Sequence, residues 1–342
     1  MILCRHWAVG IFLWLGCAVA VPVAAQQVFR VMEYNVENLF DCTHDSLKND
    51  REFLPDGLRR WTYRRYTEKL GRIAQVIWSV ADGGEVPAIV GLCEVENGRC
   101  LEDLVSRSPL QAAGYRYVLT DSPDLRGIDV ALLYHPQQFR CLSVQSVRIP
   151  LTGKGCRPTR DLLHVCGRMM ATGDTLDVLV CHLPSRLGGV RKTRPFRLQA
   201  ARRLRQVADS VAACRMQPRL LLMGDFNDAP GSRTLAEVLD ASAAANGAGT
   251  LIDLMEGQLP GTYCYRGHWE IIDHLIVNGT LQGDAPGWRV VPSSVRIVDT
   301  PFLLEEDDTY GGVRPFRTYR GFRYAGGYSD HLPIVAEFQT YE

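Results

Sequence analysis

Two kinds of hydrophobic pattern alternate along the chain. Short apolar, β-branched runs bounded by turn residues predict β-strands, and longer segments with apolar residues three or four positions apart predict helices. The predicted strands are Val28–Val36, Ala88–Val95, Val130–Tyr134, Leu176–Leu183, Leu220–Asp225, Ile271–Val277 and Leu332–Phe338. Strands that alternate with helices in this way indicate packed sheets with helices outside them, which is an α/β fold.

Two helices are clear in the pattern. The first covers Tyr63–Val80, where apolar residues such as Leu70 and Ile73 share one face. The second is predicted to begin after Thr193-Arg194-Pro195, with Thr193 as its N-cap and its later arginines facing solvent.

The first 25 residues are typical of an export signal. Arg5 and His6 precede an apolar run from Trp7 to Val21, and small residues follow at Val23-Ala24-Ala25. We therefore expect a signal peptide at residues 1–25 and a mature protein that is periplasmic or extracellular. An uncleaved membrane anchor is the alternative, because the run approaches spanning length. A lipoprotein modified at Cys17 is a second, less well matched alternative.

The remainder, residues 26–342, is predicted to form a single domain. The chain of 342 residues is 46% hydrophobic and 22% charged, which suits a large core and excludes a disordered protein. It contains no internal repeat or low-complexity linker, and no later stretch is apolar enough to cross a bilayer. We expect a monomer without stable membrane insertion.

Charge and cysteine content exclude several classes of protein. The formal net charge is zero, so an anionic substrate must be attracted locally rather than by the whole molecule. Of the 11 cysteines, Cys4 and Cys17 lie in the predicted signal. The other nine are scattered and show no Cys-x-x-Cys spacing, so at most one or two disulfides, no zinc site and no cysteine catalysis are expected.

Five polar residues stand at the ends of four predicted strands or next to them. Asn35, Glu94, Asp225, Asp330 and His331 all occupy such positions, where side chains from different strands can converge on one crevice. Carboxylate and amide oxygens are the ligands that Mg²⁺, Mn²⁺ or Ca²⁺ prefer. The pattern therefore predicts a divalent-metal site.

The motifs around these residues resemble, in order, those of the endonuclease/exonuclease/phosphatase family, the deoxyribonuclease-I-like superfamily, in its secreted bacterial form. They are Tyr34-Asn35-Val36-Glu37-Asn38-Leu39, Cys93-Glu94-Val95-Glu96-Asn97, Cys181-His182-Leu183, Gly224-Asp225-Phe226-Asn227, Ile272-Asp273-His274 and Tyr328-Ser329-Asp330-His331-Leu332-Pro333. The resemblance covers about Val28 to Phe338. It implies a four-layer sandwich of two packed mixed β-sheets flanked by helices.

The resemblance also implies roles for these residues. Glu94 and Asn35 would hold a Mg²⁺ or Mn²⁺ ion, with Ca²⁺ as an alternative, and Asp330 would lie close to its coordination sphere. Asp225 would take the proton from the attacking water. The remaining roles fall to Asn227, which would hold the phosphate or the water, and to His331, which would contact the phosphoryl oxygen and be oriented by Asp273.

Substrate choice depends on residues outside this set. His182 resembles the second histidine of secreted nucleases and sphingomyelinases, where it is the general acid. Asp129 is a candidate to orient it, although an ordinary residue at the start of a strand is an equal alternative. Arg186 and Arg317 are expected to contact phosphate through their forked guanidinium groups, and Asn38 is expected to bind substrate.

Three functions remain open at this point. The first is a phosphodiesterase that acts on nucleic acid, which the two histidines and the arginine-rich segments favour. The second is a phosphomonoesterase or phospholipid head-group hydrolase, of the sphingomyelinase or inositide-phosphatase kind, which the neutral net charge favours. Tyr34 stands where many relatives have tryptophan, and the Pro-Ala-Trp-Cys-Asp-Arg pattern of inositol 5-phosphatases is absent. The third is a non-catalytic binding protein.

Overall fold

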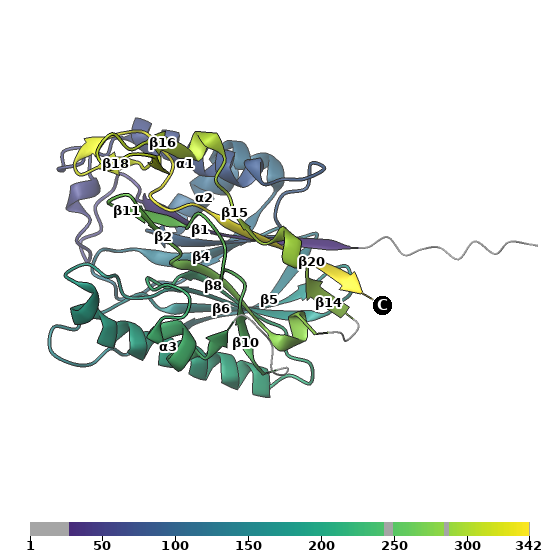
Figure 1. Ribbon diagram of the computed structural model, residues 1–342. Coiled ribbons are helices and arrows are strands. Elements are labelled where there is room, and N and C mark those ends of the chain that lie inside the picture. The colour runs from purple at the N-terminus through teal and green to yellow at the C-terminus, as the bar shows by residue number, and fades with distance from the viewer. Residues whose placement is uncertain (1–26, 243–248, 284–286, 342) are drawn as a thin grey trace, which may run out of the picture.

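Two mixed β-sheets pack face to face between helices (Figure 1). The computed structural model describes residues 27–242, 249–283 and 287–341. Helices α1 (Tyr63–Ser79) and α2 (Gly98–Arg107) lie on one side of the pair of sheets, and α3 (Val190–Ala213) lies along the other. The predicted four-layer α/β sandwich is confirmed.

Each sheet has seven strands among the described residues. The first has the order β14-β20-β1-β2-β4-β3, with β15 paired to β20; the bounds are β14 Gly287–Val290, β20 Ile334–Tyr341, β1 Val28–Leu39, β2 Ile89–Val95, β4 Asp129–Tyr134, β3 Arg116–Leu119 and β15 Arg296–Ile297. The second has the order β5 Phe139–Val147, β6 Leu162–Met169, β7 Thr175–His182, β8 Leu220–Asp225, β13 Asp273–Asn278, β10 Leu251–Asp253 and β9 Ala241–Ser242.

Smaller elements cover the ends of the sheets. Three two-stranded ribbons pair β11 (Tyr263–Tyr265) with β12 (His268–Glu270), β16 (Leu304–Glu306) with β17 (Val313–Pro315), and β18 (Tyr319–Arg320) with β19 (Arg323–Tyr324). Short 3₁₀ helices span Arg51–Phe53, Pro109–Ala113, Gly279–Leu281, Pro292–Ser294 and Pro301–Leu303, and a π-helical segment spans Arg233–Leu239.

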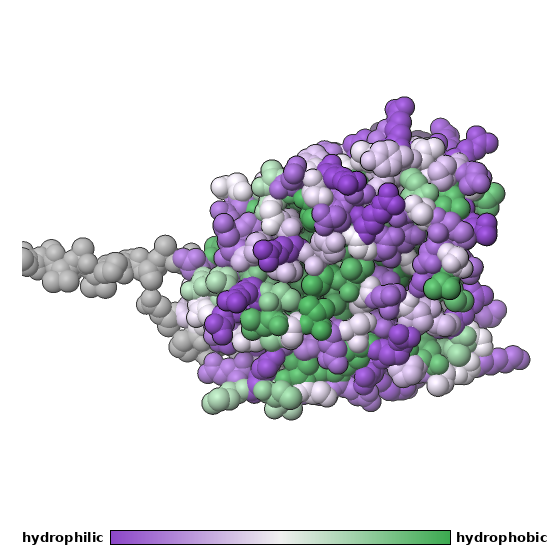
Figure 2. Space-filling model, turned by 180° about the vertical axis from the view of Figure 1, so that it is seen from behind, coloured by the Kyte–Doolittle hydropathy of each residue, from purple (hydrophilic) through white to green (hydrophobic). Residues whose placement is uncertain are grey.

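Apolar side chains fill the space between the sheets and the space beneath the helices. Val31, Leu92 and Met223 are fully buried in the larger cluster, which joins both sheets to α1 and α2. Leu204 of α3 and Leu222 of β8 belong to a second cluster on the outer face of the second sheet. Burial of such side chains contributes about 1.5–3 kcal/mol each. Seen from behind, hydrophilic side chains surround a group of hydrophobic ones in the middle of the face (Figure 2).

Helix α3 differs from its prediction at its beginning. It starts at Val190, after Gly189, and continues through Pro195. Thr193 is not the N-cap, because its hydroxyl donates to the carbonyl of Gly189, at 3.1 Å, from inside the first turn. Pro195 is the sixth residue of α3, so the helix loses the hydrogen bond that its N–H would make and accommodates the proline ring in its second turn.

The N-terminal segment, the helices and the cysteines bear on the predicted export signal, membrane insertion and disulfides. The predicted signal peptide, residues 1–25, lies outside the described residues. No helix among the described residues is both long and apolar enough to cross a membrane. The nine cysteines of the described chain are all free thiols, and Cys93, Cys100, Cys166 and Cys181 are buried.

Gly224, a buried residue directly before Asp225 on β8, provides a test of local packing. Its φ is +139°, and a Cβ at this position would lie 1.8 Å from the carbonyl oxygen of Cys181 on the neighbouring strand. Gly224→Ala should therefore lower the free energy of unfolding by at least about 3 kcal/mol through overpacking and strain. Denaturant unfolding measures this.

The matched control is Gly173→Ala. Gly173 also has a positive φ, +79°, but its Cβ would meet nothing within 4 Å. Strain alone should cost about 1–2 kcal/mol there. Equal losses in the two variants would contradict the close approach at Gly224.

Candidate active site

Strand pairing brings the predicted site residues to one end of the sandwich. In the second sheet, His182 at the end of β7 pairs with Asp225 at the end of β8, and Asp225 pairs on its other side with Asp273 at the start of β13. Asn35 lies on β1, a central strand of the opposite sheet. The Nδ2 of Asn35 donates to Oδ2 of Asp225 over 3.2 Å, so the two sheets meet at this carboxylate.

Asp225 is buried and receives several contacts. The backbone N–H of Asn227 donates to its Oδ1 at 2.8 Å. Nε2 of His182 lies 3.3 Å from its Oδ2. Burial raises the pKa of Asp225 above the usual value for an aspartate, and the nearby charge of His331 opposes the shift. A carboxylate of this kind is a stronger base than an exposed one.

His331 is held by Asp273, as the resemblance implied. Its Nδ1 lies 2.8 Å from Oδ2 of Asp273, and both residues are buried. Burial disfavours the charged imidazole, but the carboxylates of Asp273, Asp225 and Asp330 together outweigh burial, and the pKa of His331 is raised well above its usual value. Among the described residues, Asp225, Asp273 and His331 also form a group whose possible ligand atoms all lie within 4.8 Å of one another.

His182 is the neutral member of the two histidines. Burial lowers its pKa well below the usual value, and Arg160 adds to the effect. Its Nδ1 has no hydrogen-bond partner among the described residues.

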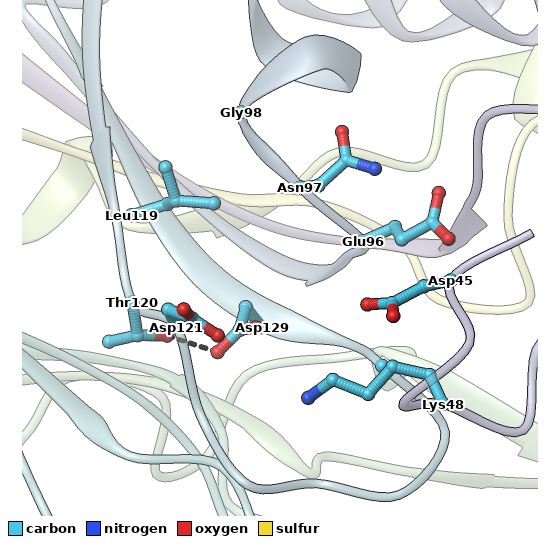
Figure 3. Close-up of a pocket in the computed structure, with 10 residues that line it drawn as sticks. Asp45, Lys48, Glu96, Asn97, Gly98, Leu119, Thr120, Asp121 and Asp129 are labelled. Atoms are coloured by element: carbon cyan, nitrogen blue, oxygen red, sulfur yellow. Dashed lines mark hydrogen bonds between the residues drawn. The ribbon is translucent and has the colours of Figure 1, made fainter. Parts of the chain in front are cut away.

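Asp129 does not orient His182 in the described structure. Its Oδ1 accepts the hydroxyl of Thr120 at 2.5 Å and the N–H of Ser122 at 3.0 Å. Figure 3 shows Asp129 bonded to Thr120 on the wall of a separate cavity of about 330 Å³, opposite Lys48. The strand-start alternative describes this residue better, because its carboxylate bonds to Thr120 and Ser122 in the segment that follows β3.

Each of the three predicted metal ligands carries a hard oxygen atom that accepts a hydrogen bond in the described structure. Oδ1 of Asn35 accepts the N–H of Glu37 at 3.1 Å, and Oε2 of Glu94 accepts the N–H of Asn38 at 3.0 Å. Oδ2 of Asp330 accepts Nη2 of Arg317 at 2.8 Å. One amide and two carboxylates fit a Mg²⁺-type ion, which keeps some of its water and needs only one or two protein carboxylates.

The two predicted phosphate-binding arginines already have protein partners. Arg186 donates to the carbonyl of Asn227 at 2.7 Å and to Glu270 at 2.8 Å. Arg317 bridges Glu37 and Asp330, at 3.2 and 2.8 Å from its Nη2. Both side chains lie at the site, but each is neutralised by acidic groups. Asn38 accepts a hydrogen bond from Arg126 through its Oδ1.

Comparison with known proteins agrees with this geometry. The family model of the endonuclease/exonuclease/phosphatase family matches residues 30–340. The chain belongs to the endonuclease/exonuclease/phosphatase family. Enzymes of this family are divalent-metal-dependent and hydrolyse phosphate esters. The predicted class of enzyme, a hydrolase acting on phosphate ester bonds, is therefore confirmed.

Solved structures share the fold of this family member. An endonuclease/exonuclease/phosphatase family protein of Bacteroides thetaiotaomicron has a TM-score of 0.58 and 17% identity, covering 92% of this chain and 96% of that chain. A mannosyl-6-phosphatase of the same species has a TM-score of 0.58 and 18% identity, and the match covers 91% of this chain and 99% of that chain. The human Nocturnin catalytic domain with bound sulfate has a TM-score of 0.55 and 19% identity, and the match covers 92% of this chain and 95% of that chain. A search of curated proteins found no match.

Backbone strain in this endonuclease/exonuclease/phosphatase family member is concentrated at the site. Seven non-glycine residues among those described have positive φ, and four of them are Glu37, Asn38, Glu94 and Asn227. Such conformations cost about 1–3 kcal/mol each and persist only where the surroundings enforce them. Three of them lie near the ends of β1 and β2, where the N–H of Asn38 donates to Glu94, and Asn227 follows β8.

The sequence did not predict Glu33. It is fully buried on β1, two residues before Asn35 and therefore on the same face of the sheet. Neither of its carboxylate oxygens has a hydrogen-bond partner among the described residues. Burial raises its pKa well above the usual value, and Asp273 and Asp225 raise it further. In the sequence, Glu33 could have been noticed as an acidic residue inside the apolar run Val28–Val36.

Proposed function

We propose that this chain is an exported, divalent-metal-dependent phosphodiesterase that activates water for attack on phosphorus. The observation that carries the proposal is the position of Asp225. It is bonded to Asn35 of the opposite sheet and flanked by His182 and by the His331–Asp273 pair. One base, one cationic histidine and one neutral histidine therefore face a common space. Export rests on the signal-like pattern at residues 1–25.

Asn35, Glu94 and Asp330 would hold the metal ion. A bound Mg²⁺ or Mn²⁺ supplies positive charge where the phosphoryl oxygens become more negative, and it makes water easier to deprotonate. Burial acts to raise the pKa of Asp330, but Arg317, His331 and Lys69 together outweigh burial and lower the pKa of that carboxyl.

Asp225 takes the proton from the attacking water, and Asn227 holds that carboxylate in place. The N–H of Asn227 bonds to Asp225, and its side-chain amide donates to the carbonyl of Leu183 at 3.1 Å. His331, protonated against Asp273, donates to a phosphoryl oxygen through its other ring nitrogen. A fixed cation at that point is most effective in the transition state, where charge accumulates.

His182 serves the leaving group. The neutral imidazole of the free enzyme must gain a proton before it can act as a general acid. A bound phosphate adds negative charge beside it and so favours the protonated form.

The pH profile depends on Asp273. Asp273→Asn removes the carboxylate that raises the pKa of His331. His331 should then lose its proton at lower pH, so the alkaline limb of kcat against pH should shift toward acid. A pH series on both proteins measures this. An alkaline limb at the same pH in both would show that the pair does not set this ionisation.

Nucleic acid is the proposed substrate, because a second histidine lies beside the catalytic carboxylate. A phosphomonoesterase or head-group hydrolase is the second candidate, and a specific observation favours it. Arg186 and Arg317 are occupied by Glu270, Glu37 and Asp330, so neither is free to hold an extended polyanion. One structural neighbour is named a mannosyl-6-phosphatase.

A substrate panel separates the two candidates. Purified protein would be incubated in Mg²⁺ or Mn²⁺ with plasmid DNA, oligoribonucleotides, sphingomyelin, phosphoinositides and sugar phosphates. Cleavage of DNA or RNA supports the nuclease. Release of phosphate or phosphocholine without any cleavage of nucleic acid would replace it with the second candidate.

A further inference from the structure

Lys69 is a buried cation that the proposed chemistry does not use. It lies on α1, which covers the outer face of the first sheet (Figure 1), and is 1% exposed. Its ammonium group donates to the hydroxyl of Thr318 at 2.6 Å and to the carbonyl of Tyr328 at 2.5 Å. Both partners belong to late loops, and Tyr328 immediately precedes Ser329-Asp330-His331. One side chain of a helix therefore reaches the segment that carries two site residues.

A charged network continues from Lys69 into the site. The N–H of Thr318 donates to Oε2 of Glu37 at 2.6 Å, and Arg317 joins Oε1 of Glu37 to Asp330. Lys69 is thus connected to Asp330 along two routes, through the backbone after Tyr328 and through Glu37 and Arg317. Ser329 closes the arrangement, because its hydroxyl donates to the carbonyl of Asn35 at 2.6 Å.

A purely structural role explains this lysine poorly. A buried ammonium group carries a large desolvation cost, and replacing a whole buried ion pair by well-packed apolar side chains is often neutral or stabilising. Burial lowers the pKa of Lys69 to about 8, although Glu37 and Asp330 counteract the effect. Neighbouring inward positions of α1, Leu70, Ile73 and Ile77, are apolar, as stability alone favours. Lys69 is the exception, and it lies where α1 contacts the loops that contain Thr318 and Tyr328.

We propose that Lys69 is a positioning residue of the phosphoesterase site, which ties Thr318 and the segment Tyr328–His331 to α1 and so sets the place of Asp330 and His331. This inference rests on the proposed function. Removing a residue that hydrogen-bonds to a metal ligand and fixes its orientation typically lowers metal affinity or activity by about 10- to 100-fold.

The test compares Lys69→Met with Arg30→Met. Arg30 is also a buried cation, 7% exposed and paired with Glu337, but it lies near the start of β1, away from the site. Lys69→Met should lower kcat about 10-fold or more and raise the Mg²⁺ concentration for half-maximal rate, with KM for substrate unchanged. Arg30→Met should lose stability but keep the wild-type kcat and Mg²⁺ requirement.

Thr318 provides a second pair of variants, which remains informative if Lys69→Met does not fold. Thr318→Val removes the hydroxyl that receives Lys69 and should shift kcat and the Mg²⁺ requirement in the same direction by a smaller factor. Thr318→Ser keeps the hydroxyl and should restore both. Wild-type values in Lys69→Met, or equal losses of kcat in Lys69→Met and Arg30→Met, would overturn the proposal. So would equal activity in Thr318→Val and Thr318→Ser.

Amide hydrogen exchange separates this inference from the proposed function. Exchange at Tyr328–Leu332 should be faster in Lys69→Met than in wild type, and unchanged in Arg30→Met. If the wild-type protein hydrolyses no phosphate ester, the proposed function fails. The exchange result still decides whether Lys69 positions the segment, and unchanged exchange in Lys69→Met would reject it.

Discussion

Replacing Asp225 by asparagine should lower kcat by about 10²–10⁴-fold, the usual contribution of a general base. The substitution keeps the shape of the side chain, but the amide cannot accept a proton from water. The single oxygen of asparagine can still accept the N–H of Asn227, and only the bond from Asn35 is lost, so the fold should survive. Steady-state kinetics on the best substrate of the panel measures the effect.

Asp177→Asn is the matched control for Asp225→Asn. Asp177 is equally buried and lies on β7, at the other end of that strand from His182, where it pairs with Arg215 and His164. Its loss should reduce stability and leave kcat near the wild-type value. If kcat in Asp225→Asn stayed within a factor of about 10 of wild type, Asp225 would not be the base.

Glu94→Gln should produce the second large effect, a rate about 10²–10³-fold lower at limiting Mg²⁺. The glutamine keeps an oxygen that can receive the N–H of Asn38, but it removes the negative charge that attracts the ion. Raising the Mg²⁺ concentration should therefore recover part of the rate. A titration of rate against Mg²⁺ shows both features.

The neighbouring residue Glu96 gives a close control for Glu94→Gln. Its carboxyl accepts the N–H of Asp41 at 2.7 Å and lines the separate cavity of Figure 3. Burial raises the pKa of Glu96 to about 8, so at neutral pH the group is mostly uncharged and resembles glutamine already. Glu96→Gln should keep the wild-type Mg²⁺ curve. If Glu96→Gln shifted the Mg²⁺ curve as much as Glu94→Gln, the assignment of Glu94 to the metal site would be wrong.

The strands that meet at the site could be predicted because their residues carry strong local signals. Leu220–Asp225 is observed with the bounds that its apolar run predicts, and Asn35, Asp225 and Asp273 follow from pairing at strand ends. Strands β5 and β6 were not predicted. In β5, an edge strand with Leu142 and Val144 exposed, burial does not alternate along the sequence. Periodicity is therefore a weak signal there.

Contacts between distant segments could not be predicted from local pattern. Arg317 lies 280 positions from Glu37, and only the folded chain shows that acidic groups already occupy it. Asp129 has the right sequence position for a partner of His182, but its carboxylate turns to Thr120. Lys69 is an ordinary helix residue in sequence, and its role depends on loops that approach α1 from the other end of the chain.

The central claim is that one metal-dependent phosphoesterase site forms where the two sheets meet at Asp225. The most direct measurement is ester cleavage across the substrate panel by wild type and His331→Ala, each with Mg²⁺ and with chelator. The account predicts that wild type cleaves at least one phosphate ester, that chelation stops cleavage, and that His331→Ala is nearly inactive. Cleavage that survives chelation or the loss of His331, or no cleavage of any ester, would contradict it.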